Sequence, residues 1–331
     1  MLKEKFEQLE TWYDHSVEKT INIKTVPYRG VAPFLELVDK VLRAGGKVLY
    51  ITGEDKEKVL LVEELRARGW DSFSLHQEFE IQEDAALVVV DYHQATRVRG
   101  AYDLAIYDDV NSFPIHKKPE MQTLIGLIYG HCKKVLAYSF ETVFMGVEVV
   151  EVPLAERSGF VSEPRVIETR LNLEEFVPTS VYEYLLWFVY EKKKVLFLTE
   201  NKKVKRKVAR FLSKIDETFS ACIYDVDEIG TRKMVELSQD ESKPHIFITD
   251  DLDDYLDVPA NLEIIIHGAD APRYSYRELL FFCLRSGYYD ELNGEVIMLC
   301  QTITRDIERT REMTRYFNKV LWEQGFEQSP T

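Results

Sequence analysis

Residues His93–Pro114, HQATRVRGAYDLAIYDDVNSFP, give the clearest indication of fold in this 331-residue chain. At their centre, the uninterrupted apolar run Leu104–Tyr107 predicts a strand buried on both faces, as in a parallel sheet covered by helices. Asp108 and Asp109 follow this strand directly. Because open α/β sheets bind ligands beyond the carboxyl ends of their strands, the two carboxylates are candidate catalytic residues that would hold Mg²⁺ and position water. The alternative is a polar exit from the strand without a catalytic function.

Similar apolar runs on both sides of this stretch predict further buried strands, with helical patterns between them. In the first half the expected strands are Lys47–Thr52, Leu87–Val90 and Val135–Tyr138, and the expected helices are Val31–Arg43, Asp55–Arg68 and Pro119–Tyr129. In the second half the expected strands are Val195–Thr199, Ile246–Thr249, Ile264–His267 and Val296–Cys300, and the expected helices are Val181–Tyr190, Lys202–Lys214, Tyr276–Leu284 and Thr304–Glu323. This alternation is typical of α/β domains with mainly parallel sheets.

Residues 150–170 are the best linker candidate, because they contain two prolines and a glycine and have no helical period. A chain of this length usually forms about two domains. We therefore expect an N-terminal helical extension (1–20), a first domain (21–155) and a second domain (156–331).

The composition is that of a soluble globular protein, with 45% hydrophobic and 30% charged residues. Forty-two basic and 57 acidic residues give a formal net charge of −15, which disfavours a broad nucleic-acid-binding surface without excluding a local one. No apolar segment approaches the roughly 20 residues that cross a bilayer, and the charged N-terminus has no apolar signal core. We therefore expect a cytoplasmic protein without a membrane span. The cysteines lack zinc-site spacing and are expected to be buried free thiols: Cys132, Cys222, Cys283 and Cys300.

Residues 191–214 are strongly basic, with ten basic and two acidic residues. Val204, Val208 and Leu212 have the spacing of a core-facing helix, so the basic side chains are expected on the outer face. We predict that this face contacts phosphate groups through Lys202, Lys203, Lys205, Arg206 and Lys207. The alternative is a solvated helix face. Base stacking is not expected, because the run lacks interleaved aromatic residues.

Three other groups are candidates with weaker signals. The first group follows the strand Leu87–Val90 and consists of His93, Gln94 and Arg97. These residues are candidates for contacting nucleic acid; the alternative is an ordinary loop or helix start. Arg285 ends an expected helix and is a candidate phosphate ligand, although a charge before a glycine cap is the alternative. The acidic run 250–254 lacks the spacing of an EF-hand, so a solvated loop is favoured and we expect no metal.

Taken in order along the chain, these segments resemble the ComFA-like, DEAD/DEAH-type superfamily 2 helicases, the ATP-driven motors of competence-linked DNA uptake. In that family a His-Gln-x-x-Arg element precedes, by the same interval, a strand ending in Asp-Glu-Val-Asp-x-Phe-Pro; here the ending is Asp108–Pro114, DDVNSFP. The resemblance continues at His267–Asp270, Phe281–Gly287 and Asn293–Val296, and covers roughly residues 25–325. It implies two tandem RecA-like (P-loop NTPase-like) domains with a nucleotide cleft between them and nucleic acid crossing both.

The departures from the family fall on its catalytic positions. The P-loop should precede the helix Val31–Arg43, but residues 26–33 read VPYRGVAP. The residues at the nucleotide-binding position are Tyr28, Arg29 and Gly30. The chain contains no GxxxxGK[ST], so the phosphate-binding lysine and the Mg²⁺-binding hydroxyl of a P-loop are missing. Asp109 replaces the catalytic glutamate, and Arg285 is the one arginine left of two in the sixth motif.

These losses predict a helicase-like protein without ATPase activity, in which Asp108, Asp109 and Arg285 are inactive remnants. We expect no cofactor, because ATP and Mg²⁺ would be needed only by an active enzyme. As a scaffold or regulatory subunit, the protein would bind an unidentified protein partner and nucleic acid only weakly, since like charges repel.

Two alternatives stay open. One is an ATP-dependent DNA helicase or translocase with an atypical nucleotide site, which the missing P-loop disfavours. The other is an unrelated α/β enzyme, such as a nucleotide-sugar transferase, that uses a cleft near Asp108; the matching His93–Pro114 segment disfavours it.

Overall fold

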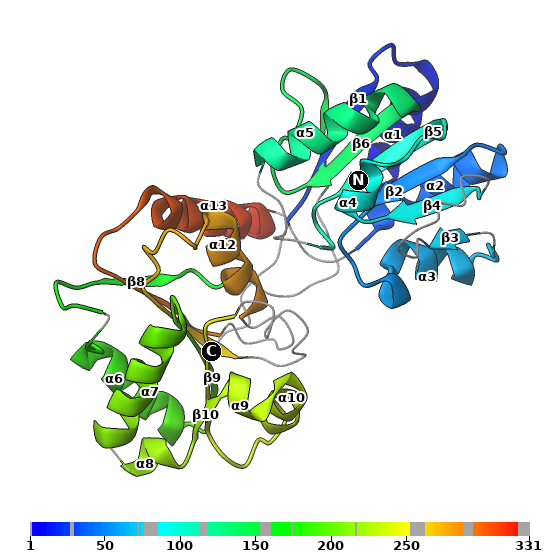
Figure 1. The fold of residues 1–331 in the computed structure, drawn as a ribbon. Helices are drawn as coiled ribbons and strands as arrows, with labels where there is room; N and C mark the ends of the chain where they lie inside the picture. The colour runs from blue at the N-terminus through cyan, green and yellow to red at the C-terminus, as the bar shows by residue number, and fades with distance from the viewer. Residues whose placement is uncertain are drawn as a thin grey trace. The chain divides into compact units, whose positions relative to one another are not determined.

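The computed structural model describes residues 2–26, 30–71, 73–75, 85–112, 118–152, 160–173, 175–215, 217–251, 262–286 and 294–323. The chain divides into two compact units, Met1–Arg157 and Ser158–Thr331 (Figure 1). Each unit is an α/β domain with its own sheet. None of the helices in the described part of the chain combines the length and apolar character needed to cross a membrane.

The first unit is built on a seven-stranded parallel sheet with the order β3-β4-β2-β5-β6-β1-β7. Its strands are β1 (Thr20–Lys24), β2 (Val48–Ile51), β3 (Phe73–Leu75), β4 (Leu87–Val90), β5 (Tyr102–Asp108), β6 (Cys132–Ser139) and β7 (Val149–Glu151). Asp108 pairs with Tyr138, and Lys24 with Ser139, so the carboxyl ends of β5, β6 and β1 lie at the same edge.

Helices cover both faces of this sheet. They are α1 (Leu2–His15), α2 (Ala32–Arg43), α3 (Leu60–Ala67), α4 (Tyr92–Ala95) and α5 (Lys118–Ile128), with short 3₁₀ turns at Lys56–Lys58 and Tyr129–His131. One core cluster joins the sheet to α1, α2 and α3, and the other joins it to α4 and α5. The chain leaves β1 in one direction along the sheet and leaves β6 in the other, so β1 and β6 flank a topological switch point, where open α/β sheets bind ligands.

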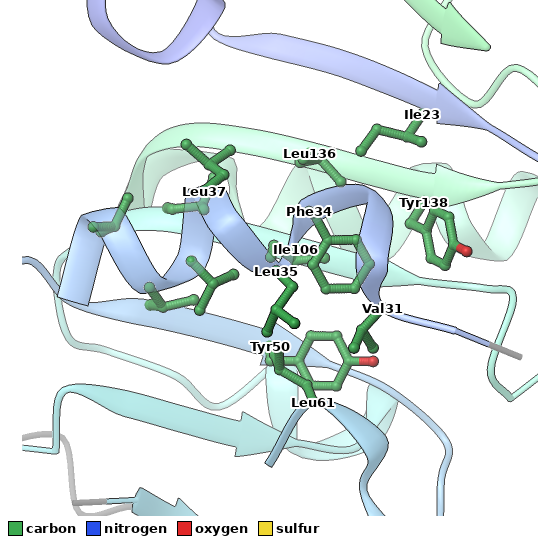
Figure 2. Packing of buried hydrophobic residues seen from close by; sticks show 14 of the residues in the cluster. Ile23, Val31, Phe34, Leu35, Leu37, Tyr50, Leu61, Ile106, Leu136 and Tyr138 are labelled. Carbon is green, nitrogen blue, oxygen red and sulfur yellow. The ribbon is translucent and has the colours of Figure 1, made fainter. Parts of the chain in front are cut away.

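An aromatic cluster fills the core beneath α2. Figure 2 shows Phe34 of α2 between Tyr50 of β2 and Tyr138 of β6. The ring centroid of Phe34 lies 6.1 Å from that of Tyr50 and 5.1 Å from that of Tyr138. All three side chains are fully buried. The start of α2 is therefore fixed by packing against two neighbouring parts of the sheet.

The second unit has a six-stranded parallel sheet with the order β10-β11-β9-β12-β13-β8. Its strands are β8 (Arg165–Glu168), β9 (Lys194–Leu198), β10 (Ile223–Asp225), β11 (His245–Thr249), β12 (Glu263–His267) and β13 (Val296–Cys300). Its helices are α6 (Thr179–Tyr190), α7 (Lys202–Ile215), α8 (Glu217–Ser220), α9 (Val226–Ile229), α10 (Thr231–Ser238), α12 (Tyr276–Arg285) and α13 (Arg305–Glu323). A single core cluster joins α6, α7 and α8 to the sheet, and α12 packs against α13.

The predicted strands and helices are present, together with elements that were not predicted, among them β1, β3, β10 and α10. Three of the expectations differ from the structure in detail. The expected helix Asp55–Arg68 is divided, because Val59 is extended between the 3₁₀ turn and α3. The expected linker contains β7 and β8, one in each sheet. Leu9 and Trp12 of α1 belong to the core cluster of α2, so the N-terminal helix is part of the first unit and not a separate extension. The four cysteines are buried free thiols, as predicted.

Candidate functional site

The carboxylate of Asp108 is fully buried at the end of β5 and accepts hydrogen bonds on both oxygens. Its Oδ1 accepts the backbone N–H groups of Val110 (2.8 Å) and Asn111 (3.0 Å). Its Oδ2 accepts the side-chain amide of Asn111 (2.5 Å) and the hydroxyl of Tyr50. Burial raises the pKa of Asp108, and these hydrogen bonds oppose that rise. The carboxylate of Asp108, which was predicted to hold Mg²⁺, thus accepts four hydrogen bonds from groups within the protein.

Asn111 also connects this carboxylate to the segment between β1 and α2. The N–H of Gly30 donates to Asn111 Oδ1 (2.7 Å), and Asn111 Nδ2 donates to the carbonyl of Gly30 (3.2 Å). In a P-loop the backbone N–H groups of this segment would cradle phosphate. Here the N–H of Gly30 is committed to a side chain of the same unit. Tyr28 and Arg29, the other residues predicted at this position, lie outside the described residues.

The first turn of α2 carries no group that could bind phosphate or Mg²⁺ through its side chain. It reads Ala32-Pro33-Phe34-Leu35, where a P-loop has a lysine followed by serine or threonine at the helix start. Val31 precedes the helix and supplies no side-chain cap, and Phe34 points into the core between two tyrosines (Figure 2). Apolar packing therefore dominates at this helix end.

Asp109 is held against the neighbouring strand. It is 1% exposed, its backbone N–H donates to the carbonyl of Tyr138 (2.9 Å), and its Oδ2 accepts the hydroxyl of Ser139 (2.7 Å). The side chain of Asp109 thus joins the end of β5 to the end of β6.

The second predicted group lies on the short helix α4. Gln94 is buried and forms a capping box with Asp91: Asp91 Oδ1 accepts the N–H of Gln94 (2.8 Å), and Gln94 Oε1 accepts the N–H of Asp91 (3.2 Å). Its carboxamide oxygen is therefore used within the protein. His93 and Arg97 are exposed beside it.

The basic helix α7 presents most of its cations to solvent, with Lys205 as the exception. Lys202, Lys203 and Arg206 are exposed and Lys207 is half-buried. The side chain of Lys205 is 2% exposed, so it does not lie on the predicted outer face.

The ammonium of Lys205 lies among three carboxylates. It is 3.0 Å from Asp225 Oδ1, 2.8 Å from Asp227 Oδ2 and 2.9 Å from Asp250 Oδ1. These acids come from the end of β10, the start of α9 and the residue after β11. Burial lowers the pKa of Lys205, but the carboxylates outweigh burial and raise it overall. Lys205 is thus a buried counter-ion, and this explains why it cannot contact phosphate as predicted.

Arg285 is half-buried in the last turn of α12, and its guanidinium lies 5.9 Å from the centre of the Phe281 ring. Of the predicted acidic loop, Asp250 pairs with Lys205 as described, and residues 252–254 lie outside the described residues. Within the described ranges, no three His, Cys, Asp or Glu side chains are arranged to hold a metal ion.

The sequence did not identify Tyr50 and Asn111 as partners of Asp108. Asn111 lies within the stretch His93–Pro114, at the place where the resembled family has the second aspartate of its motif, and this replacement was the available signal. Tyr50 lies in a strand whose apolar pattern predicts only burial.

Replacing Asn111 with alanine is expected to lower the free energy of unfolding of the first unit by about 3 kcal/mol, because buried partners on Asp108 and Gly30 lose their hydrogen bonds. Urea unfolding followed by circular dichroism would measure the loss. Asn201→Ala is the control, since it removes an exposed cap of α7 and should cost about 1 kcal/mol. Equal losses in the two variants would contradict the proposed role of Asn111.

No protein-family model and no curated protein matches this chain. Among solved structures, the Mycobacterium smegmatis helicase Lhr bound to ssDNA and AMP-PNP is similar with TM-score 0.50 and 11% identity, over 96% of this chain and 49% of Lhr. Mss116p bound to ssRNA and AMP-PNP has TM-score 0.53 and 10% identity, over 96% of this chain and 75% of its own. The DUF1998 helicase MrfA bound to DNA has TM-score 0.53 and 13% identity, over 95% of this chain and 51% of the MrfA chain.

These similarities show the fold. The chain consists of two tandem RecA-like α/β domains with parallel sheets, as predicted, and it shares this fold with the helicases named above. The chain spans about half the length of the Lhr and MrfA chains that it resembles.

Proposed function

We propose that this chain is a helicase-like protein that has lost ATP hydrolysis and acts as a scaffold or regulatory subunit in a nucleic-acid-related process. The observation that carries the proposal is the Asn111 bridge, which occupies the carboxylate of Asp108 and the backbone of Gly30 at once. In an active site of this type, the first group would serve Mg²⁺ and the second would serve phosphate.

The start of α2 supports the same proposal. Binding of the β- and γ-phosphates by a P-loop depends on its lysine, its glycine-rich backbone and its hydroxyl together. Removing one contact to a transition state typically costs about 3–4 kcal/mol, so the combined loss would remove both nucleotide affinity and rate. Pro33 and Phe34 contribute neither a charge nor a hydroxyl.

The nucleic-acid-related role is supported by the fold, since Lhr, Mss116p and MrfA were each solved with bound DNA or RNA. The resemblance of His93–Pro114 to the ComFA-like helicases favours a competence-like process. A scaffold acts by binding another protein. Affinity purification of the tagged chain from its own cells is the experiment that would identify this partner.

The alternative is an ATP-dependent DNA helicase or translocase with an atypical nucleotide site. It is favoured by one observation, the retention of two adjacent carboxylates at the end of β5 beside a topological switch point.

An ATPase assay separates the two proposals. Purified protein with Mg-ATP, with and without single-stranded and duplex DNA, is expected to release phosphate at the same rate as the Asp108→Ala and Asp109→Asn variants. If neither substitution changes the rate of phosphate release, the activity comes from a contaminating enzyme, and this result agrees with the proposal. DNA-stimulated turnover that either substitution abolishes would overturn it, provided that circular dichroism shows the variant to be folded.

A further inference from the structure

Figure 1 shows helix α7 in the second unit. The outer face of this helix carries a continuous row of cations. Its members are Lys203, Arg206, Lys207, Arg210 and Lys214. At about 100° per residue these five positions fall within about 100° of the helix circumference. Val204, Val208 and Leu212 are buried on the opposite side, which fixes the direction of the row toward solvent. We refer to these five residues as the α7 basic face.

Four of the five residues of this face have no carboxylate partner among the described residues. In the part of the chain that the structure describes, no carboxylate forms an ion pair with Arg206, Lys207, Arg210 or Lys214, whereas Lys202 pairs with Asp227 at 3.3 Å and Lys205 is enclosed by acids. In a chain with a net charge of −15, this row is a local region of positive potential that would attract a polyanion.

The α7 basic face is separate from the edge where open α/β sheets bind ligands. At that edge of the second sheet, Asp225 and Asp250 stand at the ends of β10 and β11, and their positive partner is the buried Lys205. The ends of β10 and β11 therefore carry carboxylates, while the cations of the α7 basic face point outward from the helix that covers the sheet. A polyanion is expected to approach the helix face more readily than these two strand ends.

The composition of the face indicates which polyanion it suits. Protein interfaces are anchored by exposed aromatic or aliphatic side chains at their centre, and residues 202–214 of α7 expose no large hydrophobic side chain. A membrane-binding helix would insert its apolar side, but that side of α7 is packed in the core. A row of like charges without an apolar centre fits the regular phosphates of nucleic acid.

We propose that the α7 basic face is a docking surface for the phosphate backbone of duplex nucleic acid, which it contacts without reading the bases. From Lys203 to Lys214 the helix rises about 16 Å, comparable to five phosphates along one strand of a duplex. The inference rests on the nucleic-acid-related role proposed above and is independent of the loss of ATP hydrolysis.

The test is the salt dependence of binding to a fluorescent 20-base-pair DNA duplex, measured by anisotropy in EDTA without nucleotide. Five phosphate contacts predict a slope of about −4.5 for log K against log salt, which weakens binding roughly 500-fold between 50 and 200 mM salt. The double variant R206Q/R210Q is expected to bind at least tenfold more weakly at 50 mM salt, with a slope shallower by about 2.

The matched control is R309Q/K319Q, which removes two exposed cations from α13 and changes the net charge equally. It should keep the slope of the unmodified protein. The proposal is overturned if the unmodified protein does not bind the duplex at 50 mM salt, or if the two double variants bind alike. It is also overturned if polyglutamate competes as well as unlabelled duplex at equal charge, because the face would then suit an acidic protein. Since no nucleotide is present, the result does not depend on the ATPase assay.

Discussion

Replacing Lys205 with methionine is expected to lower the free energy of unfolding of the second unit by about 3 kcal/mol. This is the low end of the cost of breaking a buried ion pair, because Lys205 is buried whereas its three carboxylate partners are partly exposed to solvent. The substitution keeps the length and the apolar stem of the side chain. It removes the ammonium that lies within 3.0 Å of Asp225, Asp227 and Asp250. The three carboxylates then repel one another without a cation between them.

The cost should depend on pH. Hydrogen bonding to Lys205 lowers the pKa of Asp227 in the folded protein. A carboxyl whose pKa is lowered by folding contributes stability above its unfolded pKa of about 3.9, and this stability is lost as the pH falls through the folded value. The difference between the unmodified protein and the Lys205→Met variant is therefore largest near neutral pH and narrows below about pH 4.

Hydrogen exchange read by mass spectrometry would localise this effect to β10, β11 and α7, while urea unfolding gives its size. Lys202→Met is the matched control on the same helix. Lys202 lies 3.3 Å from Asp227, but its side chain is 68% exposed, so its loss should cost less than about 1 kcal/mol. A similar small loss for both variants, or a cost for Lys205→Met that does not change with pH, would contradict the assigned role of Lys205 as counter-ion.

The sequence was most informative where the sheet is buried on both faces. Runs such as Leu87–Val90 and Val296–Cys300 are entirely apolar because helices cover both sides of a parallel strand, and the structure has these two strands with the predicted bounds. The strand β1 was not predicted, since its polar Asn22 interrupts the apolar pattern. Asn22 is nevertheless buried, and its side chain bonds the backbone of Val143 and Phe144.

The site shows where sequence reasoning reaches its limit. Asp108 and Asp109 were placed correctly at the end of a buried strand, because strand ends are visible in the apolar pattern. The hydrogen bond from the hydroxyl of Tyr50 to Asp108 depends on which strands are neighbours in the sheet. Tyr50 lies 58 residues earlier in the chain, so the local sequence pattern does not reveal it as a partner. Lys205 likewise reads as one more lysine of a basic run, and only the folded sheet brings its three acids to it.

Substitution of Asp108 with asparagine is expected to destabilise the first unit by about 3 kcal/mol, and the direction of this change separates a structural carboxylate from a catalytic one. The amide would turn an N–H₂ group toward donors that now point at the carboxylate, Tyr50 and the backbone N–H groups. Hydrogen bonds to a charged group contribute about 1.5–3 kcal/mol each, so losing one or two of them accounts for the expected cost.

A working catalytic carboxylate would behave in the opposite way. Active sites hold groups in arrangements that cost stability, so replacing such a group often stabilises the protein while it abolishes activity. Asp103→Asn, at the other end of β5, is the control; Asp103 accepts the N–H of Lys47 (2.8 Å) and pairs with the exposed Lys133 (2.6 Å), and its loss should cost about 1 kcal/mol. Thermal unfolding that shows Asp108→Asn to be as stable as the unmodified protein, or more so, would mean that Asp108 is poised for an external ligand, and the helicase alternative would then be favoured. A clear loss of stability, well beyond that of the control, would mean that the hydrogen bonds of the Asp108 carboxylate hold the fold together. The same carboxylate would then not be available to bind Mg²⁺.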